Sequence, residues 1–373
     1  MRSWHKLLVR SLLAFIVVGV VAFIAWRNNT RGDSATISPK RSSDDRATTS
    51  TRQSSDELVL VESRESIYNN IYVYRTGTYV RMTFGHNQHL YVESRYNTAD
   101  DRELPEPYTQ FMTASLMYPD KINSILEIGC GGGRTAWYLH RFLPNVQITT
   151  VELDPAVVEL SRKYFGIKNE PNFRVVARDG RMFLADSKDR YDVILIDAYR
   201  GPFVPFHLLT LEFYQMVKRH LAQGGVMAQN IEPTTMLFDS AVKTLYGVFP
   251  QIELYDAGGP GTSSALTGAD VGNSVVAIAY DGGGYGSADL SSMADKRQSA
   301  YGLRYDLRQM LPHRFLLKTV GSSLDVVNQA GISTGGIDDK AKILLDDFAP
   351  VESLKAIARH NQKWTIQSDS ATQ

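Results

Sequence analysis

The sequence predicts an α/β fold, with a mostly parallel sheet covered by helices on both faces and a small antiparallel sheet before it. The first supporting observation is that short apolar runs alternate with helical stretches over residues 125–228. The second is a glycine-rich turn directly after the first run, and the third is an acidic residue near the end of the runs that follow. Strand–helix alternation is typical of parallel sheets, whose ligands bind at the carboxyl ends of the strands.

Composition sets broad limits on function. The chain of 373 residues has 40 basic and 40 acidic residues, so no overall positive charge favours nucleic acid as a partner. Its single cysteine, Cys130, excludes an intrachain disulfide and a cysteine-rich zinc site. His86, His89 and His207 lack the spacing of metal ligands, and we predict no metal.

The chain begins with an apolar segment that we interpret as a membrane anchor. Residues 12–26 carry no charge, and if Arg10 snorkels to the headgroups the span covers residues 7–26, after a short tail at 1–6. Tryptophans flank this span as they do at membrane interfaces. A cleaved signal peptide is the alternative, but no small-residue cleavage site precedes Asn28. The sequence therefore predicts a single-pass membrane protein.

Residues 27–57 are predicted to form a disordered linker, because they have almost nothing apolar to bury. Two folded regions are predicted after this linker, followed by a C-terminal tail at 356–373. The first, residues 58–118, holds short β-branched and aromatic runs broken by polar turns, and then an apolar pattern with helical spacing. We expect a small antiparallel sheet and one helix, at Leu58–Glu62, Ile71–Arg75, Tyr79–Phe84, His89–Glu93 and then Tyr108–Tyr118.

The second region, residues 119–355, is predicted to form the parallel α/β domain. Its expected strands are Ile125–Ile128, Ile148–Val151, Phe173–Val176, Val193–Ile196 and Gly225–Ala228. Its expected helices are Thr135–Phe142, Ala156–Tyr164, Gly180–Ala185 and Leu208–Leu221. A further polar-faced helix is expected at Lys296–Leu311, and the glycine-rich segment Asp281–Gly286 is interpreted as a loop.

The turn after the first predicted strand of this domain is the strongest functional signal. Glu127 stands in the strand, and Gly129, Gly131 and Gly133 follow at alternate positions. Glycines there let a ligand approach the main chain, and the next helix offers unpaired amides. Such a turn alone fits any Rossmann-like nucleotide site or a simple tight turn.

Carboxylates at two further strand ends favour nucleotide binding. Glu152 follows the second strand about twenty residues past the glycines, where a carboxylate accepts both ribose hydroxyls. Asp179 follows the third strand and is placed to accept the adenine amino group. Each alone is more often a helix cap or a surface charge, but their repetition at successive strand ends predicts a nucleotide site.

Four segments, LEIGCGGGRT, VELDPAVVELSRKYF, ARDGRMFL and YDVILIDAY, resemble the spermidine synthase family. The resemblance covers about residues 58–354 and implies a Rossmann-like domain that binds an S-adenosyl nucleotide on a mostly parallel seven-stranded sheet. It extends to the segment FGHNQ, in which Gln88 would touch the nucleotide, and to the segment LDDFAPVE near the C-terminus. By this resemblance Glu152 would hold the ribose, and Asp179 with Gly180 the adenine.

The resemblance also implies a catalytic carboxylate. Asp197, at the end of the fourth strand, would align the attacking amine and accept its proton, because a free amine with a pKa of about 10 is mostly protonated at neutral pH. Tyr108 falls where the family has a tyrosine lining the amine tunnel, and Tyr199 is a further candidate for contact with substrate.

Three departures from the family concern the amine half of the site. Arg200 stands where other members have a second acidic residue, and would repel an amine. Gly132 replaces the aspartate of the family's glycine loop, and the segment Gly258–Ser264 replaces one with an amine-binding tyrosine.

We therefore expect a transferase that uses decarboxylated S-adenosylmethionine, or S-adenosylmethionine itself, as co-substrate. The leading interpretation is aminopropyl transfer to a small-molecule amine or other nucleophilic acceptor, as in polyamine biosynthesis. A methyltransferase on the same fold and a non-catalytic nucleotide-binding scaffold at the membrane are the alternatives. A nucleotide made in the cytoplasm would place the catalytic domain on the cytoplasmic side of the membrane, and the resemblance implies a homo-oligomer.

Overall fold

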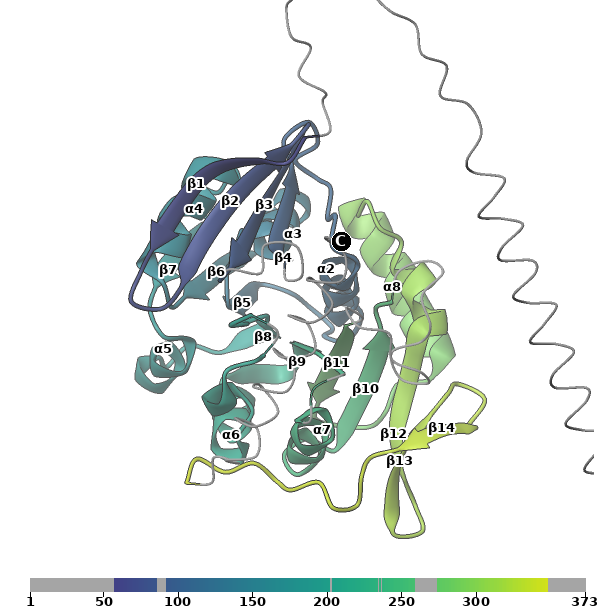
Figure 1. Ribbon diagram of the computed structural model, residues 1–373. Helices are drawn as coiled ribbons and strands as arrows, with labels where there is room; N and C mark the ends of the chain where they lie inside the picture. Colours follow the sequence, from purple (N-terminus) through teal and green to yellow (C-terminus); the bar gives the residue numbers. More distant parts are fainter. Residues whose placement is uncertain are drawn as a thin grey trace, which may run out of the picture. The chain divides into compact units, whose positions relative to one another are not determined.

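The computed structural model describes residues 57–85, 92–201, 203–233, 235, 237–258 and 274–347, which all belong to one compact unit. The β-structure of these residues consists of a four-stranded sheet and a ten-stranded sheet (Figure 1). The α/β class predicted from the sequence, with a small antiparallel sheet beside a larger one, is confirmed.

The predicted membrane localisation needs correction. Within the described ranges, no helix is long and apolar enough to cross a bilayer. The segments predicted as a tail at 1–6, an anchor at 7–26 and a C-terminal tail at 356–373 lie outside those ranges, as does the predicted linker at 27–57 except for its last residue.

The small sheet is antiparallel throughout, with its strands in chain order. They are β1 (Val59–Glu65), β2 (Asn70–Thr76), β3 (Tyr79–Phe84) and β4 (Val92–Asn97). The described part of the fourth strand begins at Val92 and runs beyond the end predicted from the sequence. Alternate residues such as Val73, Val80 and Met82 are fully buried, as expected for a sheet with one face on the core.

The first half of the large sheet is parallel, in the order β9-β8-β5-β6-β7. Its strands are β5 (Ser124–Ile128), β6 (Gln147–Glu152), β7 (Phe173–Ala177), β8 (Tyr191–Ile196) and β9 (Leu221–Ile231). The helices along this stretch are α2 (Pro107–Met112), α3 (Arg134–Phe142), α4 (Pro155–Tyr164), α5 (Gly180–Asp186), α6 (Leu211–Arg219) and α7 (Phe238–Tyr246). Short 3-10 turns lie at Thr113–Met117 and Phe206–Leu208.

The second half of the large sheet is antiparallel, in the order β14-β13-β12-β10-β11, with β11 next to β9. Its strands are β10 (Gln251–Asp256), β11 (Val275–Tyr280), β12 (Arg314–Val320), β13 (Ser323–Val327) and β14 (Ser333–Gly336). The prediction of a mostly parallel seven-stranded sheet is wrong, since four neighbouring pairs are parallel and five antiparallel. Strands β12, β13 and β14 follow one another through short connections and therefore pair as antiparallel neighbours.

Helix α8 (Ser287–Tyr301) and the 3-10 helix Leu307–His313 replace the single helix predicted at Lys296–Leu311. The helix begins directly after the glycine-rich segment, where the Asp289 carboxylate accepts the Gly286 amide at 3.0 Å. It ends at Gly302, whose φ of 59° is a left-handed conformation typical of helix C-termini.

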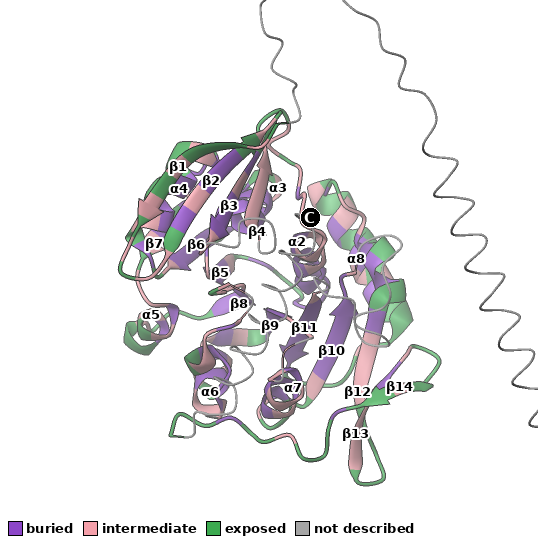
Figure 2. Ribbon diagram, in the orientation of Figure 1, coloured by how far each residue is buried: buried purple, intermediate pink, exposed green. Residues whose placement is uncertain are grey.

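Helices pack on both faces of the large sheet around its parallel strands, so the core forms two layers, whereas β14 at the edge of the sheet is largely exposed (Figure 2). One layer contains residues of α2, α3, α4 and α8 with one face of the strands, for example Ile125 and Val193. The other contains residues of α5, α6 and α7 with the opposite face, for example Leu126 and Ile194. Adjacent strand residues thus point into different layers, which explains the continuous apolar runs in the sequence.

A buried ion pair holds the antiparallel half together. Arg314 at the start of β12 and Glu253 in β10 are both almost fully buried, and Arg314 Nη2 lies 2.6 Å from Glu253 Oε1. The Tyr280 hydroxyl donates to the same carboxylate at 2.7 Å, and the Tyr118 hydroxyl donates to its other oxygen. The carboxylate charge is therefore compensated on both oxygens inside the core.

Candidate active site

The candidate residues gather at one edge of the sheet, where the parallel strands end. Glu127 stands near the end of β5, Glu152 ends β6, and Asp179 and Asp197 follow β7 and β8. The sequence predicted this edge, because parallel strands bring their carboxyl ends together. Gln88 lies outside the described residues.

The glycine loop makes close contact with the end of β8. Gly129 has a φ of 91°, and a Cβ atom placed on it would lie 2.3 Å from the Asp197 carbonyl oxygen. The Gly129 amide donates to the Val151 carbonyl oxygen at 2.9 Å, and the Asp197 amide donates to that of Ile128 at 2.8 Å. Gly129 thus permits the loop and the Asp197 backbone to lie side by side.

Gly129→Ala is expected to lower the free energy of unfolding by about 1–3 kcal/mol, because the added methyl group overpacks this contact and strains a positive φ. Urea denaturation measures the change. Gly282→Ala is the matched control, since Gly282 has a φ of 105° but open space around its Cβ position. Equal losses in the two variants would contradict a specific role for the close contact.

Glu152 is tied to the glycine loop by backbone amides. Its Oε2 atom accepts the amides of Cys130 at 3.0 Å and Gly131 at 3.1 Å, and Oε1 accepts that of Asp154 at 3.0 Å. Burial raises the pKa of this carboxyl, and the three amides oppose the rise. Gly133, with a φ of 65°, then forms the N-cap of α3. The carboxylate and the loop therefore form one rigid cradle.

Glu127 lies deeper, below the loop. It is 2% exposed, and its Oε2 atom accepts the Thr150 hydroxyl at 2.6 Å. Burial raises its pKa to about 8, with the Thr150 hydrogen bond opposing the rise and repulsion from Asp197 adding to it. Glu127 also accepts the Ala136 amide in the first turn of α3 and lines the cavity described below.

Asp179 caps a helix, as the simpler interpretation of this residue suggested. Its Oδ1 atom accepts the Met182 amide of α5 at 2.8 Å, and His207 Nε2 lies 3.3 Å from Oδ2. The His207 hydrogen bond lowers the pKa of Asp179. Gly180 is buried beside it, and a Cβ atom there would lie 2.3 Å from Ile128 Cγ2. The backbone of this turn therefore packs directly on the end of β5.

Asp197 is held by side chains from two other elements. Asn230 Nδ2, near the end of β9, donates to Asp197 Oδ1 at 3.1 Å, and the Tyr108 hydroxyl of α2 also donates to the carboxylate. Burial raises the pKa of Asp197 to about 6, although both hydrogen bonds oppose the rise. The Tyr199 hydroxyl donates to the Asn230 carbonyl oxygen at 3.0 Å and so helps to hold Asn230 in place.

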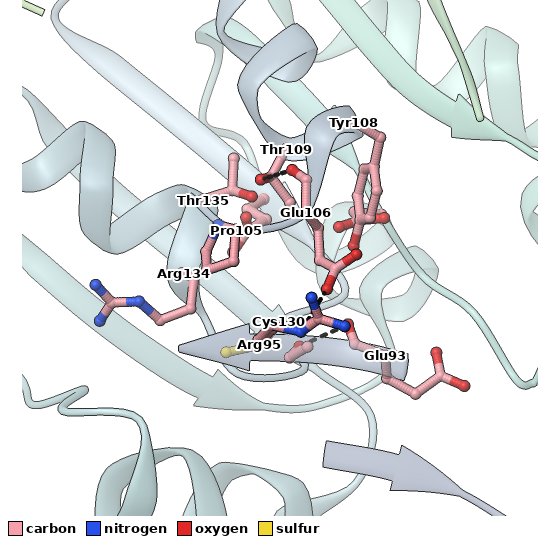
Figure 3. Close-up of a pocket in the computed structure, with 12 residues that line it drawn as sticks. Glu93, Arg95, Pro105, Glu106, Tyr108, Thr109, Cys130, Arg134 and Thr135 are labelled. Carbon is pink, nitrogen blue, oxygen red and sulfur yellow. Dashed lines mark hydrogen bonds and ion pairs between the residues drawn. The ribbon is translucent and has the colours of Figure 1, made fainter. Parts of the chain in front are cut away.

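A small cavity opens beside Asp197. Figure 3 shows residues that line it, and those labelled come from β4, from α2 and the segment before it, and from the glycine loop and the start of α3. Four carboxylates are among them, Glu93, Glu106, Glu127 and Asp197. The two arginines of the lining are engaged elsewhere or paired. Arg95 Nε lies 3.2 Å from Glu106 Oε1, and Arg134 points away to the Phe165 carbonyl oxygen at 2.9 Å.

This arrangement suits a cationic ligand. Burial raises the pKa of all four carboxyl groups, so a bound cation would favour their ionised forms, and Asp197, with a pKa of about 6, stands in the same cavity. Sequence reasoning missed Glu93 and Glu106, which reach the cavity from outside the parallel sheet. Charged residues inside the short strand VESRYN were the available signal, because strands with one buried face seldom carry them there.

Arg200 does not oppose this conclusion. Its side chain is exposed and is not among the residues that line the cavity, so the repulsion predicted from the sequence does not arise there. Among the described residues, no group of three histidine, cysteine or carboxylate side chains is placed to hold a metal ion.

Comparison with known proteins finds a matching family and similar proteins. Residues 107–269 match the family described as spermine/spermidine synthase domain. A polyamine aminopropyltransferase of Vibrio vulnificus is 31% identical over 189 residues, which is 50% of this chain and 63% of that protein. An eEF1A lysine and N-terminal methyltransferase homolog of Drosophila melanogaster is 29% identical over 146 residues, 36% of this chain and 22% of that protein. The chain thus spans less than two thirds of the length of these curated relatives.

The fold is also that of a solved structure. A probable spermidine synthase from Corynebacterium glutamicum aligns with a TM-score of 0.53 at 21% sequence identity, over 65% of this chain and 88% of that chain. At this identity the similarity establishes the fold alone. The large mixed sheet beside a small antiparallel one is therefore a known architecture.

Proposed function

Because residues 107–269 match the spermine/spermidine synthase domain family, we propose that the chain transfers an aminopropyl group from decarboxylated S-adenosylmethionine to an amine acceptor. The observation that carries the proposal is the position of Asp197. A carboxyl with a pKa of about 6 lies at the end of β8, in a cavity lined by further carboxylates and beside a glycine loop. One site thus combines a nucleotide cradle, a base and a cation-binding wall.

The cradle supports nucleotide binding through groups that are already in place. Glu152, fixed at the end of β6, is proposed to accept the ribose hydroxyls, at the cost of loosening its bonds to the loop amides. Asp179 and Gly180 are proposed to meet the adenine, since the Asp179 side chain is partly exposed at the end of β7. Glu127, Gly129, Gly131, Gly133 and Gln88 are the remaining proposed nucleotide contacts or supports.

Asp197 is proposed to act as the general base. Above pH 6 it is mostly ionised, so it can orient an ammonium group and take its proton as the amine attacks. A nitrogen–carbon bond forms, the carbon–sulfur bond breaks, and its electron pair leaves on sulfur as a neutral thioether. Tyr108 and Tyr199 are proposed to line the acceptor path, while Asn230 keeps Asp197 Oδ1 in position. The protein supplies alignment and a proton acceptor, and leaving-group assistance is unnecessary.

The acceptor is proposed to be a small amine of the polyamine class. The carboxylate lining favours a molecule with more than one ammonium group, and Arg200 is exposed rather than set against it. The proposal therefore includes a role in polyamine biosynthesis.

Methyl transfer from S-adenosylmethionine is a second candidate, and one observation favours it. The pattern Glu127-x-Gly129-x-Gly131-x-Gly133 is also that of methyltransferases. In addition, Gly132 stands where the family's glycine loop has an aspartate. The similarity to a methyltransferase homolog is in keeping with this alternative.

Calorimetric titration with the two nucleotides separates these candidates. We expect decarboxylated S-adenosylmethionine to bind at least about tenfold more tightly than S-adenosylmethionine, because the extra carboxylate would enter a cavity lined by carboxylates. Tighter binding of S-adenosylmethionine would favour the methyltransferase. Binding of neither nucleotide would favour a non-catalytic scaffold.

A further inference from the structure

We propose that Glu93 of β4 binds the primary ammonium of the aminopropyl group and so supplies the carboxylate that the glycine loop lacks at Gly132. The inference rests on the proposed function and adds the residue that selects the decarboxylated nucleotide. Glu93 belongs to β4 of the small sheet, before the residues 107–269 that match the family model.

The place of a side chain at position 132 is already filled. A Cβ atom on Gly132 would lie 2.6 Å from Phe165 Cδ1 and 2.8 Å from Ser94 Cβ. The Gly132 amide donates to the Ser94 hydroxyl at 2.7 Å, so β4 is fastened to the loop at this point. An aspartate at position 132 would have to displace β4, and the glycine is therefore required by the packing.

Glu93 is next to Ser94 in the chain and brings a carboxyl group to the cavity beside Asp197. It lines the cavity with Asp197 and Tyr108, and it accepts the Gly201 amide from the loop after β8. Its Oε1 atom is buried and has no hydrogen-bond partner among the described residues. A buried carboxylate oxygen without a partner is costly, so the group is poised for a donor that the protein does not provide.

The charges around Glu93 specify that donor as a cation. Asp197 and Glu152 both act on it by repulsion, while Arg95 is paired with Glu106. An ammonium beside Glu93 relieves this repulsion, whereas a carboxylate beside it adds to the repulsion. The two S-adenosyl nucleotides differ by that carboxylate, which makes Glu93 the residue that tells them apart.

The test compares wild type with Glu93→Gln by calorimetric titration of three probes. We expect the variant to bind decarboxylated S-adenosylmethionine about 10- to 100-fold more weakly, because a charge-assisted hydrogen bond is lost. Methylthioadenosine shares the nucleoside but has no ammonium, and its affinity is expected to stay within about twofold of wild type. The preference over S-adenosylmethionine is expected to shrink. Glu103→Gln is the control. Glu103 contacts the same strand, with 2.6 Å between Asn97 Nδ2 and Glu103 Oε2, but it does not line the cavity.

Each outcome has a definite meaning. Equal weakening for the decarboxylated nucleotide and methylthioadenosine would overturn the inference, because Glu93 would then support the fold of the site rather than the ammonium. An unchanged preference in Glu93→Gln would also overturn it, while the proposed function would stand if wild type still favours the decarboxylated form. Failure of wild type to bind that form would instead refute the proposed function.

Discussion

Asp197→Asn is expected to lower kcat for aminopropyl transfer by about 10²- to 10⁴-fold, the usual contribution of a positioned general base. Asparagine has the same shape and keeps an oxygen for the Asn230 and Tyr108 donors, but it cannot accept a proton. Affinity for methylthioadenosine is expected to change little, because the nucleoside cradle is formed by the glycine loop and Glu152. Steady-state kinetics and a calorimetric titration together measure both effects.

The pH dependence gives a second readout of the same residue. With its pKa raised to about 6, Asp197 loses its ability to take a proton as the pH falls through that value. The rate of wild type is therefore expected to fall below about pH 6, and this limb is expected to vanish from the residual rate of Asp197→Asn. An asparagine variant with full turnover would refute the role of Asp197 as base.

Arg314→Met is expected to lower the free energy of unfolding by about 3–5 kcal/mol, the typical cost of leaving one member of a buried ion pair alone. Glu253 would keep its two tyrosine donors, but its charge would be uncompensated in the core between β10 and β12. Urea denaturation measures the loss. Adding Glu253→Gln to this variant removes the stranded charge and is expected to restore part of the stability.

Arg308→Met is the matched control for this prediction. Arg308 pairs with Asp295 on the surface, where the two side chains are 52% and 54% exposed. Removal of an exposed pair is expected to cost about 0–1 kcal/mol. A loss in Arg314→Met no larger than that in Arg308→Met would contradict the structural role assigned to the buried pair.

The parallel half of the fold was predictable because its information is local. Each strand from β5 to β8 is a short apolar run closed by a glycine or a polar residue, and each predicted boundary lies within about two residues of the observed one. The antiparallel half was missed because its strands are defined by distant partners. From the sequence alone, Glu253 would be assigned to the surface because it is charged. It can be buried because Arg314, 61 residues later in the chain, pairs with it.

The same distinction applies to the site. Glu127, Glu152 and Asp197 could be found because they stand at strand ends whose geometry the α/β pattern dictates. Asp179 was found as well, although its side chain also serves as the cap of α5. Glu93 could not be weighed, since its importance depends on β4 meeting a loop that lies 38 positions beyond Ser94 in the chain. The charges inside the strand VESRYN mark it as unusual, but only the fold shows which loop this strand contacts.

The hydrogen bond from the Gly132 amide to the Ser94 hydroxyl also limits which chimeras with related proteins can fold. The small sheet and the glycine loop are encoded apart, with β4 ending at Asn97 and β5 beginning at Ser124. A crossover between those positions would join one parent's strand to another parent's loop, and a loop with aspartate at position 132 has no room beside this strand. The two segments therefore have to come from the same parent, and chimeras should exchange residues 92–133 as a single block.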